Sequence, residues 1–177
     1  MQVQTKIDLA APHSLREMLL KSERLLVIAD GGGWTPATAQ ALQRFAEKWQ
    51  MPVGDAFRFQ DTFDNHHRLY ASNVGIGLNA KLAARVKASA LVLAIGPRLG
   101  EIATGNYTLL EAPQPSQKLV HVHASAEELN RVYQTDLAIN ATMNAATFSL
   151  EALTAPATVP HRDRPGPLRP PQTIWPP

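Results

Sequence analysis

Residues 24–39 read R-L-L-V-I-A-D-G-G-G-W-T-P-A-T-A, and this stretch decides which class of fold the chain can adopt. An apolar run over residues 25–29 stops at three consecutive glycines, Gly31, Gly32 and Gly33. Thr35 is placed to cap a helix, and Pro36 stands where the first helical turn tolerates a proline. Strand, glycine turn and helix start predict a nucleotide-binding type of α/β domain, with a backbone-lined pocket for an anionic group.

The glycines match the dinucleotide-binding fingerprint only in part, because Pro36 occupies the position of its third glycine. Asp55 follows Gly33 at about the 20-residue spacing that is expected of a ribose-binding acid. One hypothesis is therefore a free-standing NAD-dependent oxidoreductase that uses the glycine turn and Asp55. The simpler interpretation of Asp55 is a carboxylate exposed to water on a strand or loop.

Length and composition limit the function classes. A chain of 177 residues suits one domain, and a net charge of +2 gives no argument for nucleic acid. The sequence contains no cysteine, which excludes disulfides, thiolate metal ligands and cysteine nucleophiles. No apolar run approaches the ~20 residues of a membrane span, and the N-terminus carries charge where a signal peptide is apolar. We expect a soluble, cytoplasmic protein with no membrane or nucleic-acid partner.

Prolines mark the C-terminal part of the chain. Eight of the 14 fall after residue 155, namely Pro156, Pro160, Pro165, Pro167, Pro170, Pro171, Pro176 and Pro177. Such a segment cannot sustain a helix or a sheet and is expected to be an extended linker. The predicted organisation is a lead-in over residues 1–13, one domain over 14–153 and a proline-rich linker over 154–177.

Apolar periodicity predicts alternating strands and helices. Strands are expected over residues 25–29, 52–57, 90–96, 118–124 and 137–141. Helices are expected from Ser14, from Pro36, over 78–88, after Ser125 and over 145–153, whereas residues 58–77 have the composition of a loop. This order predicts a three-layer α/β fold, an open and mainly parallel sheet with helices on both faces, of the Rossmann-like type.

Ligands of such sheets bind at the carboxyl ends of the strands, near the switch in strand order. Turns at 31–33, 75–77, 96–105 and 123–125 follow strands or lie in loops that can reach this edge. Arg98 comes directly after a buried strand, where its guanidinium suits a phosphate. An ion pair with Glu101 is the alternative role for Arg98.

Other polar residues fit structural roles better than catalytic ones. His121 and His123 alternate along one strand and share a face, but no third metal ligand is placed near them. No serine lies in a G-x-S-x-G elbow, and no phosphate-loop lysine follows the glycines. We therefore expect neither a catalytic residue nor a metal site in this chain.

Four segments, in the right order, resemble one enzyme family. They are L-L-V-I-A-D-G-G-G at 25–33, F-A-E-K-W-Q-M-P-V at 45–53, F-D-N-H-H-R-L-Y at 63–70 with G-I-G at 75–77, and L-V-L-A-I-G-P-R-L-G at 91–100 with T-G at 104–105. Together they are similar to the central domain of thiamine-diphosphate-dependent enzymes of the acetolactate synthase, pyruvate oxidase and decarboxylase type. The resemblance covers about residues 15–153.

This resemblance implies a three-domain subunit, usually in a dimer or tetramer, that decarboxylates or joins 2-keto acids with thiamine diphosphate and Mg²⁺. The flanking pyrimidine-binding and diphosphate-binding domains supply the cofactor-activating glutamate and the G-D-G…N-N metal motif. Asp30-Gly31 lacks the rest of that motif. The resemblance therefore implies a non-catalytic domain that binds neither thiamine diphosphate nor Mg²⁺ alone.

In some family members the central domain binds ADP or the ADP part of FAD. The positions that match those contacts are Gly31, Gly32, Gly33, Gly75, Gly77 and Arg98, with Ser125 as a candidate ribose acceptor. The family's I-D-I-D acids are replaced by V-H-A-S at 122–125, and a later G-D by A-T at 141–142. We expect an empty or weakly ADP-binding site rather than tight FAD binding, and a purely structural or oligomerising module stays open as a third hypothesis.

Overall fold

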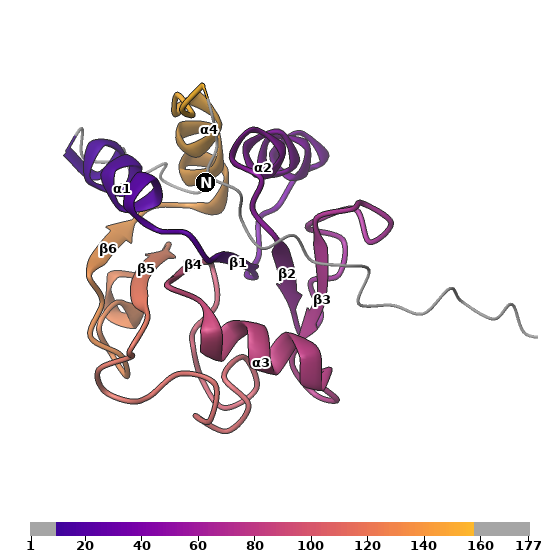
Figure 1. The fold of residues 1–177 in the computed structure, drawn as a ribbon, viewed down its shortest axis with the longest axis vertical. Helices are drawn as coiled ribbons and strands as arrows, with labels where there is room; N and C mark the ends of the chain where they lie inside the picture. Colours follow the sequence, from indigo (N-terminus) through magenta and orange to yellow (C-terminus); the bar gives the residue numbers. More distant parts are fainter. Residues whose placement is uncertain (1–9, 158–177) are drawn as a thin grey trace, which may run out of the picture.

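The computed structural model describes residues 10–157, and one six-stranded sheet runs through them (Figure 1). The strand order is β3-β2-β1-β4-β5-β6, and every neighbouring pair is parallel. The strands are β1 (Leu25–Ala29), β2 (Val53–Ala56), β3 (Tyr70–Val74), β4 (Leu91–Ile95), β5 (Lys118–His123) and β6 (Leu137–Asn140). The predicted lead-in and proline-rich linker lie largely outside the described residues, so those boundaries stay predictions.

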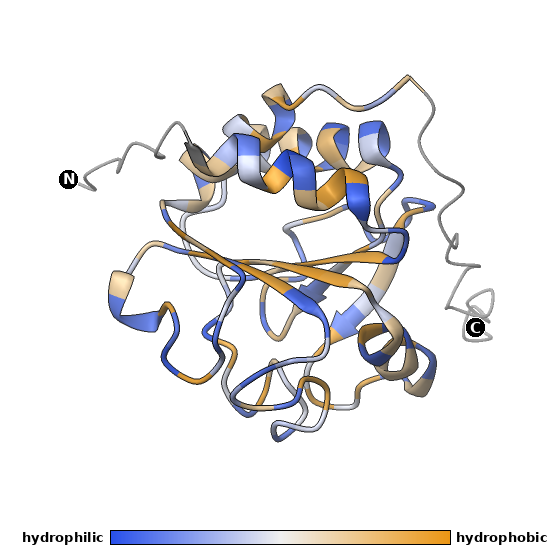
Figure 2. Ribbon diagram, turned by 60° about the vertical axis from the view of Figure 1, so that its left-hand side comes forward, coloured by the Kyte–Doolittle hydropathy of each residue, from blue (hydrophilic) through white to orange (hydrophobic). Residues whose placement is uncertain are grey.

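Helices cover the two faces of the sheet unequally. On one face lie α1 (Ala10–Lys21), α2 (Pro36–Trp49) and α4 (Met143–Ala152) (Figure 2). The other face is covered by α3 (Ala80–Ala88) and by residues 96–117, which cross from β4 to β5 without a helix. The predicted three-layer α/β fold is confirmed. Within the described residues, no helix has the length and apolar character needed to cross a membrane.

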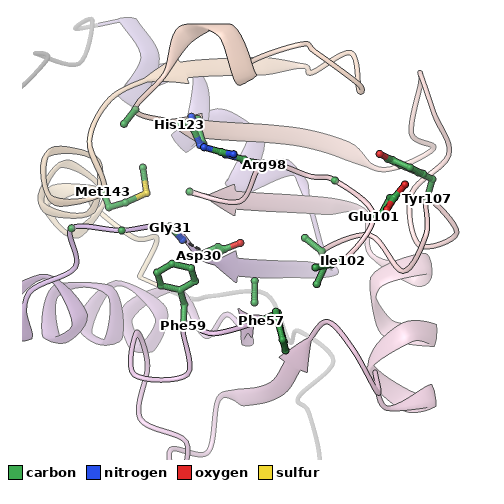
Figure 3. A pocket seen from close by; sticks show the side chains of 17 residues that line it. Asp30, Gly31, Phe57, Phe59, Arg98, Glu101, Ile102, Tyr107, His123 and Met143 are labelled. Carbon is green, nitrogen blue, oxygen red and sulfur yellow. Dashed lines mark hydrogen bonds between the residues drawn. The ribbon is translucent and has the colours of Figure 1, made fainter.

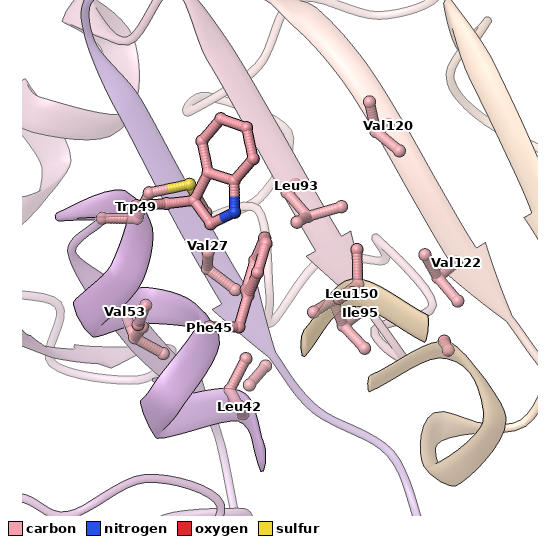
Figure 4. Packing of buried hydrophobic residues seen from close by; sticks show 14 of the residues in the cluster. Val27, Leu42, Phe45, Trp49, Val53, Leu93, Ile95, Val120, Val122 and Leu150 are labelled. Carbon is pink, nitrogen blue, oxygen red and sulfur yellow. The ribbon is translucent and has the colours of Figure 1, made fainter. Parts of the chain in front are cut away.

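Alternation along the central strands builds two separate cores. Val27 in β1 packs with α2 and α4, whereas Ile28 faces α3 and the segment 96–117. All five residues of β1 and of β4 are buried, as expected for parallel strands covered on both faces. Figure 4 shows how Phe45 and Trp49 of α2 lie against the strands in the larger core.

The predicted helix after the glycine turn forms for the expected reasons. Thr35 caps α2 by accepting a hydrogen bond from the Thr38 amide, and Pro36 is the first helical residue. Gln50 ends the helix in the left-handed conformation, with its amide bonded to the carbonyls of the last turn. The apolar stripe that predicted the helix is the face that it buries.

Strand β3 corrects the prediction that residues 58–77 are only a loop. This edge strand pairs with β2 alone, and its register shifts at Val53/Gly54. Ser72 and Asn73 are half-buried, so the strand lacks the apolar run that marks a central strand. Ser72 also has φ +92°, a conformation that its residue type does not signal.

Two predicted helix starts are also wrong. The residues after Ser125 form only a three-residue 3₁₀ turn, Ala126–Glu128, and the Ser125 side chain caps nothing there. The Ser125 amide instead donates to Nδ1 of His123 at 3.0 Å. At the N-terminus, α1 begins at Ala10, so Ser14 lies inside the helix and its capping-box spacing is coincidental.

The carboxyl ends of β1 and β4 meet through two glycines. Gly31 has φ +83° and Gly96 has φ +92°, a region that favours glycine. A Cβ atom on Gly96 would lie 2.1 Å from the Asp30 carbonyl oxygen and 2.6 Å from Sδ of Met143. A Cβ atom on Gly31 would lie 3.1 Å from the Gly96 carbonyl oxygen. The two turns therefore approach each other backbone to backbone.

We predict that Gly96→Ala lowers the free energy of unfolding by about 3 kcal/mol or more, because it combines left-handed strain with a backbone clash. Chemical denaturation measures the loss. Gly100→Ala is the matched control, since nothing lies within 4 Å of its Cβ position, and it should change stability by no more than about 0.5 kcal/mol. Equal stability of the two variants would contradict the close approach.

Candidate functional site

A cavity of about 840 Å³ opens at the carboxyl ends of the strands, beside the junction of β1 and β4 (Figure 3). The strand order reverses at this junction, which is where ligands of such sheets bind. Its wall comes from the turns after β1, β2, β4 and β5 and from the start of α4. The lining residues are Asp30, Gly31, Gly32, Gly33, Ala56, Phe57, Phe59, Gly96, Arg98, Gly100, Glu101, Ile102, Ala103, Tyr107, His123, Ala124 and Met143.

The glycine turn reaches the cavity, but its first amide is already occupied. The Gly31 amide donates to Oδ1 of Asp30 at 2.6 Å. The Asp30 carboxylate lines the same cavity and is half-buried. Burial raises the pKa of Asp30 above its ordinary value, while the Gly31 hydrogen bond and the nearby His123 act in the opposite direction. An acid therefore stands beside the turn that is predicted to hold an anion.

The N-terminus of α2 does not line the cavity, which corrects one part of the predicted anion pocket. The N-terminus of α2 is capped by Thr35 and lies outside the cavity wall. Thr142 caps α4 by accepting from the Ala145 amide at 3.3 Å. The Thr38 hydroxyl also donates to Oδ1 of Asn144, which ties the first turns of the two helices together. In each helix the threonine cap therefore satisfies one amide of the first turn, that of Thr38 or of Ala145.

Arg98 and His123 are the basic residues of the cavity wall. The Arg98 side chain is 78% exposed, and its Nε lies 3.8 Å from Oε1 of Glu128. The alternative partner Glu101 is not the one used. Glu128 also accepts from Arg131 at 3.0 Å, so Arg98 shares its counter-ion. A long, shared and exposed ion pair leaves the Arg98 guanidinium able to bind an anionic ligand.

His121 supports this part of the wall from behind. It is buried, and its Nε2 donates to the Pro97 carbonyl oxygen at 2.7 Å, directly before Arg98. Burial lowers the pKa of His121, although the hydrogen bond to Pro97 acts in the opposite direction. The rings of His121 and His123 lie 5.9 Å apart on the shared face that the alternation predicted. A structural role for His121 fits this position.

Aromatic and aliphatic side chains form the opposite end of the cavity. Phe57 and Phe59 follow β2, while Ile102 and Tyr107 come from the segment 96–117. Ile102 is 48% exposed and Tyr107 is 41% exposed, which is high for large apolar groups. Sequence reasoning missed this wall, although F-R-F directly after the second strand was a signal for it.

The remaining predicted contacts lie elsewhere. Gly75, Gly77 and Ser125 do not line the cavity. A Cβ atom on Gly75 would come within 2.9 Å of Cβ of Phe57, so this glycine gives the Phe57 turn its room. The structure therefore gathers Gly31, Gly32, Gly33 and Arg98 at one place, and any contact of the other three with a nucleotide stays a prediction.

Asp55 is neither a cavity residue nor a water-exposed carboxylate, which corrects the simpler interpretation. It is fully buried in β2. Its Oδ2 and Oδ1 accept from the Tyr70 hydroxyl at 2.9 and 3.1 Å, and Oδ1 also accepts from Nδ2 of Asn73 at 2.9 Å. The carboxylate thus holds β3 to β2 and is not presented to a ribose in the cavity.

Metal-binding side chains do not gather in this part of the chain. Within residues 10–157, no three His, Asp or Glu side chains form a group that could hold a metal ion. Asp30, Glu101 and His123 all line the cavity, but they do not form such a group. Asp30 is also engaged with the Gly31 amide. These residues do not fit a magnesium-bound diphosphate group.

Residues 13–153 match the family model described as the central domain of thiamine pyrophosphate enzymes. The chain belongs to this family. Its curated relatives include glyoxylate carboligase from Escherichia coli O157:H7, which is 31% identical over 131 residues. An acetolactate synthase large subunit from Parasynechococcus marenigrum is 24% identical over 138 residues, and a sulfoacetaldehyde acetyltransferase from Alcaligenes xylosoxydans is 27% identical over 143 residues.

The match is with one part of longer proteins. The three alignments cover 73%, 78% and 80% of this chain but only 22%, 22% and 24% of the relatives. A solved structure from Mycobacterium smegmatis, provisionally described as a thiamin diphosphate-dependent enzyme, superimposes with a TM-score of 0.65 at 19% identity. It covers 92% of this chain and 31% of that one. This chain thus shares its fold with part of the Mycobacterium smegmatis structure.

The buried contacts of Asp55 make a stability prediction. Tyr70→Phe removes the hydroxyl that donates to a fully buried carboxylate. The free energy of unfolding should fall by about 1–3 kcal/mol, because a hydrogen bond to a buried carboxylate is lost. Urea denaturation measures it, with Tyr107→Phe, at a half-exposed position, as the control that stays unchanged. A loss confined to nucleotide binding would instead indicate a ligand role for Asp55.

The raised pKa of Asp30 makes a pH-dependent prediction. An acid whose pKa is higher in the folded state destabilises the fold once both states have lost its proton, and this penalty disappears as the pH falls toward the unfolded value of 3.8. Asp30→Asn should therefore raise Tm at neutral pH, and the gain should shrink toward zero on acidification. Asp61→Asn removes the same charge at an exposed position and should show no such gain. A lower Tm for Asp30→Asn at neutral pH would contradict this expectation.

Proposed function

We propose that this chain is the non-catalytic central domain of an enzyme that decarboxylates 2-keto acids or joins them to a second carbonyl compound. The observation that carries the proposal is the match of residues 13–153 to the central domain of thiamine pyrophosphate enzymes, with a cavity at the strand-order switch. Its described wall contains no nucleophile paired with a base, so chemistry requires other domains. The names of the carboligase and synthase relatives support this class of reaction.

Thiamine diphosphate and Mg²⁺ belong, in this proposal, to flanking pyrimidine-binding and diphosphate-binding domains of a homo-oligomeric whole protein. The share of the relatives that the chain covers, about a quarter or less, leaves room for both domains. The cavity residues do not fit the magnesium-bound diphosphate, which is consistent with this division of roles. The central domain then positions its neighbours and holds at most an accessory ligand.

That accessory ligand is proposed to be ADP or the ADP part of FAD, bound weakly. Gly31, Gly32, Gly33 and Arg98 would contact it, because they share the cavity wall. Gly75, Gly77 and Ser125 would contact only a ligand that extends beyond this wall. The loss of the acids at 123 and 125 favours weak binding over tight FAD binding.

Turnover measurements test the division of roles. With thiamine diphosphate and Mg²⁺ present, the 177-residue chain should release no CO₂ from pyruvate or glyoxylate. The same sequence joined to its two flanking domains should be active. Stoichiometric, Mg²⁺-dependent binding of thiamine diphosphate to this chain alone would overturn the proposal.

Calorimetric titration with ADP and FAD tests the accessory site. Arg98→Met should weaken ADP binding about tenfold, since a hydrogen bond to a charged group contributes roughly 1.5–3 kcal/mol. Arg131→Met is the matched control, because Arg131 also contacts Glu128 but does not line the cavity. Equal losses in both variants would contradict a phosphate contact by Arg98.

An emptied structural or oligomerising module is the second candidate, and one observation favours it. The Asp30 carboxylate already occupies the Gly31 amide that an anion would use. No heat with ADP or FAD, together with a concentration-dependent dimer in sedimentation velocity, would select this candidate. The hypothesis of an NAD-dependent oxidoreductase has no ribose-binding acid at Asp55, because this residue is buried and accepts hydrogen bonds from Tyr70 and Asn73.

A further inference from the structure

We propose that Asp30 selects the ligand of this cavity, excluding a diphosphate from the glycine turn and accepting hydrogen bonds from the ribose hydroxyls of a nucleoside monophosphate. The inference rests on the proposed nucleotide site and specifies it further. It assigns to Asp30 the role of a ribose acid and moves the phosphate away from the three glycines. The glycine turn then bounds the cavity without serving as its anion site.

The first amide of the glycine turn is occupied by the protein itself. Asp30 Oδ1 accepts the Gly31 amide at 2.6 Å, so the amide that begins the turn has a partner within the protein. A phosphate on this amide would have to displace the carboxylate and remain beside its negative charge. Asp30 forms no ion pair among the described residues that would neutralise this charge. A second phosphate group adds to the repulsion.

Positive charge lies on side chains of the cavity wall. The N-terminus of α2 does not line the cavity, and the threonine caps of α2 and α4 each occupy one amide, that of Thr38 and that of Ala145. The basic side chains of the wall are Arg98 and His123, which come from the turn after β4 and the end of β5. A phosphate group placed against Arg98 would have a positively charged partner without displacing the Asp30 carboxylate from the Gly31 amide.

Basic, acidic and aromatic side chains follow one another along the cavity. Figure 3 shows Asp30 between the basic pair, Arg98 and His123, and the aromatic pair, Phe57 and Phe59. A nucleoside monophosphate carries an anionic group, hydroxyl donors and a planar base in the same order. Ribose hydroxyls donate to the carboxylate, and the base covers the apolar surface that Phe57, Phe59 and Ile102 leave exposed to the cavity.

The burial of Asp30 strengthens the preference of its carboxylate for ligand groups that donate hydrogen bonds. A half-buried carboxylate has lost part of its hydration, and the pKa of Asp30 is raised for this reason. Hydroxyl donors would restore hydrogen bonds that water no longer supplies, whereas phosphate oxygens cannot donate when ionised. The same carboxylate therefore favours ribose and disfavours a neighbouring diphosphate.

Calorimetric titration of the full chain with AMP, ADP and 2′,3′-dideoxy-AMP tests the inference. The wild-type chain should bind AMP about tenfold more tightly than ADP and about tenfold more tightly than the dideoxy analogue. In Asp30→Asn both ratios should fall toward one, because the charge that repels ADP is gone and a neutral amide accepts hydroxyl hydrogen bonds more weakly than a carboxylate. Asp61→Asn, which removes the same charge outside the cavity, should keep the wild-type ratios.

The outcomes separate this inference from the proposed accessory site. If ADP binds and the ratios are equal in wild type and Asp30→Asn, the role of Asp30 is overturned and the nucleotide site stands. If no nucleotide binds either chain while both remain folded by circular dichroism, the nucleotide site fails and the inference fails with it. If the ratios change equally in Asp61→Asn, the effect comes from the net charge of the chain, and the proposed role of Asp30 is overturned.

Discussion

The close approach of Gly31 and Gly96 is the constraint on which the rest of the structure depends. The two turns leave the sheet at the ends of its central strands, β1 and β4, and pass each other without side chains between them. Asp30 donates its amide to the Ile95 carbonyl at 2.9 Å, and Gly96 donates to Val122 at 2.8 Å, so the contact continues the parallel ladder beyond the strands. The floor of the cavity is therefore backbone that is fixed from both sides.

The sequence predicted the elements whose signals are local and strong. Strands β1 and β4 are uninterrupted apolar runs, and α2 carries a cap, a first-turn proline and an apolar stripe. β3 escaped prediction because an edge strand needs apolar residues on few positions, and two of its five are polar. The helix expected after Ser125 failed because spacing alone does not form a cap when the serine amide is bound to His123.

The candidate site was predictable only where the backbone determines it. The glycine turn and Arg98 follow strands that align in the sheet, so their convergence could be inferred. Asp55 could not be placed, since its burial depends on Tyr70 and Asn73 from the strand that was missed. The contact of Asp30 with the Gly31 amide depends on one side-chain rotamer, which no pattern in the sequence encodes.

The crossing from β4 to β5 without a helix has an evolutionary consequence. Residues 96–117 supply Arg98, Ile102 and Tyr107 to the cavity, while the larger core on the other face contains none of them. Leu99, Leu109 and Leu110 of this segment are buried against the sheet, but its exposed positions tolerate insertions and substitutions better than a packed crossover helix does. The exposed positions of this wall can thus diverge quickly among descendants of one ancestor, while α1, α2 and α4 preserve the larger core.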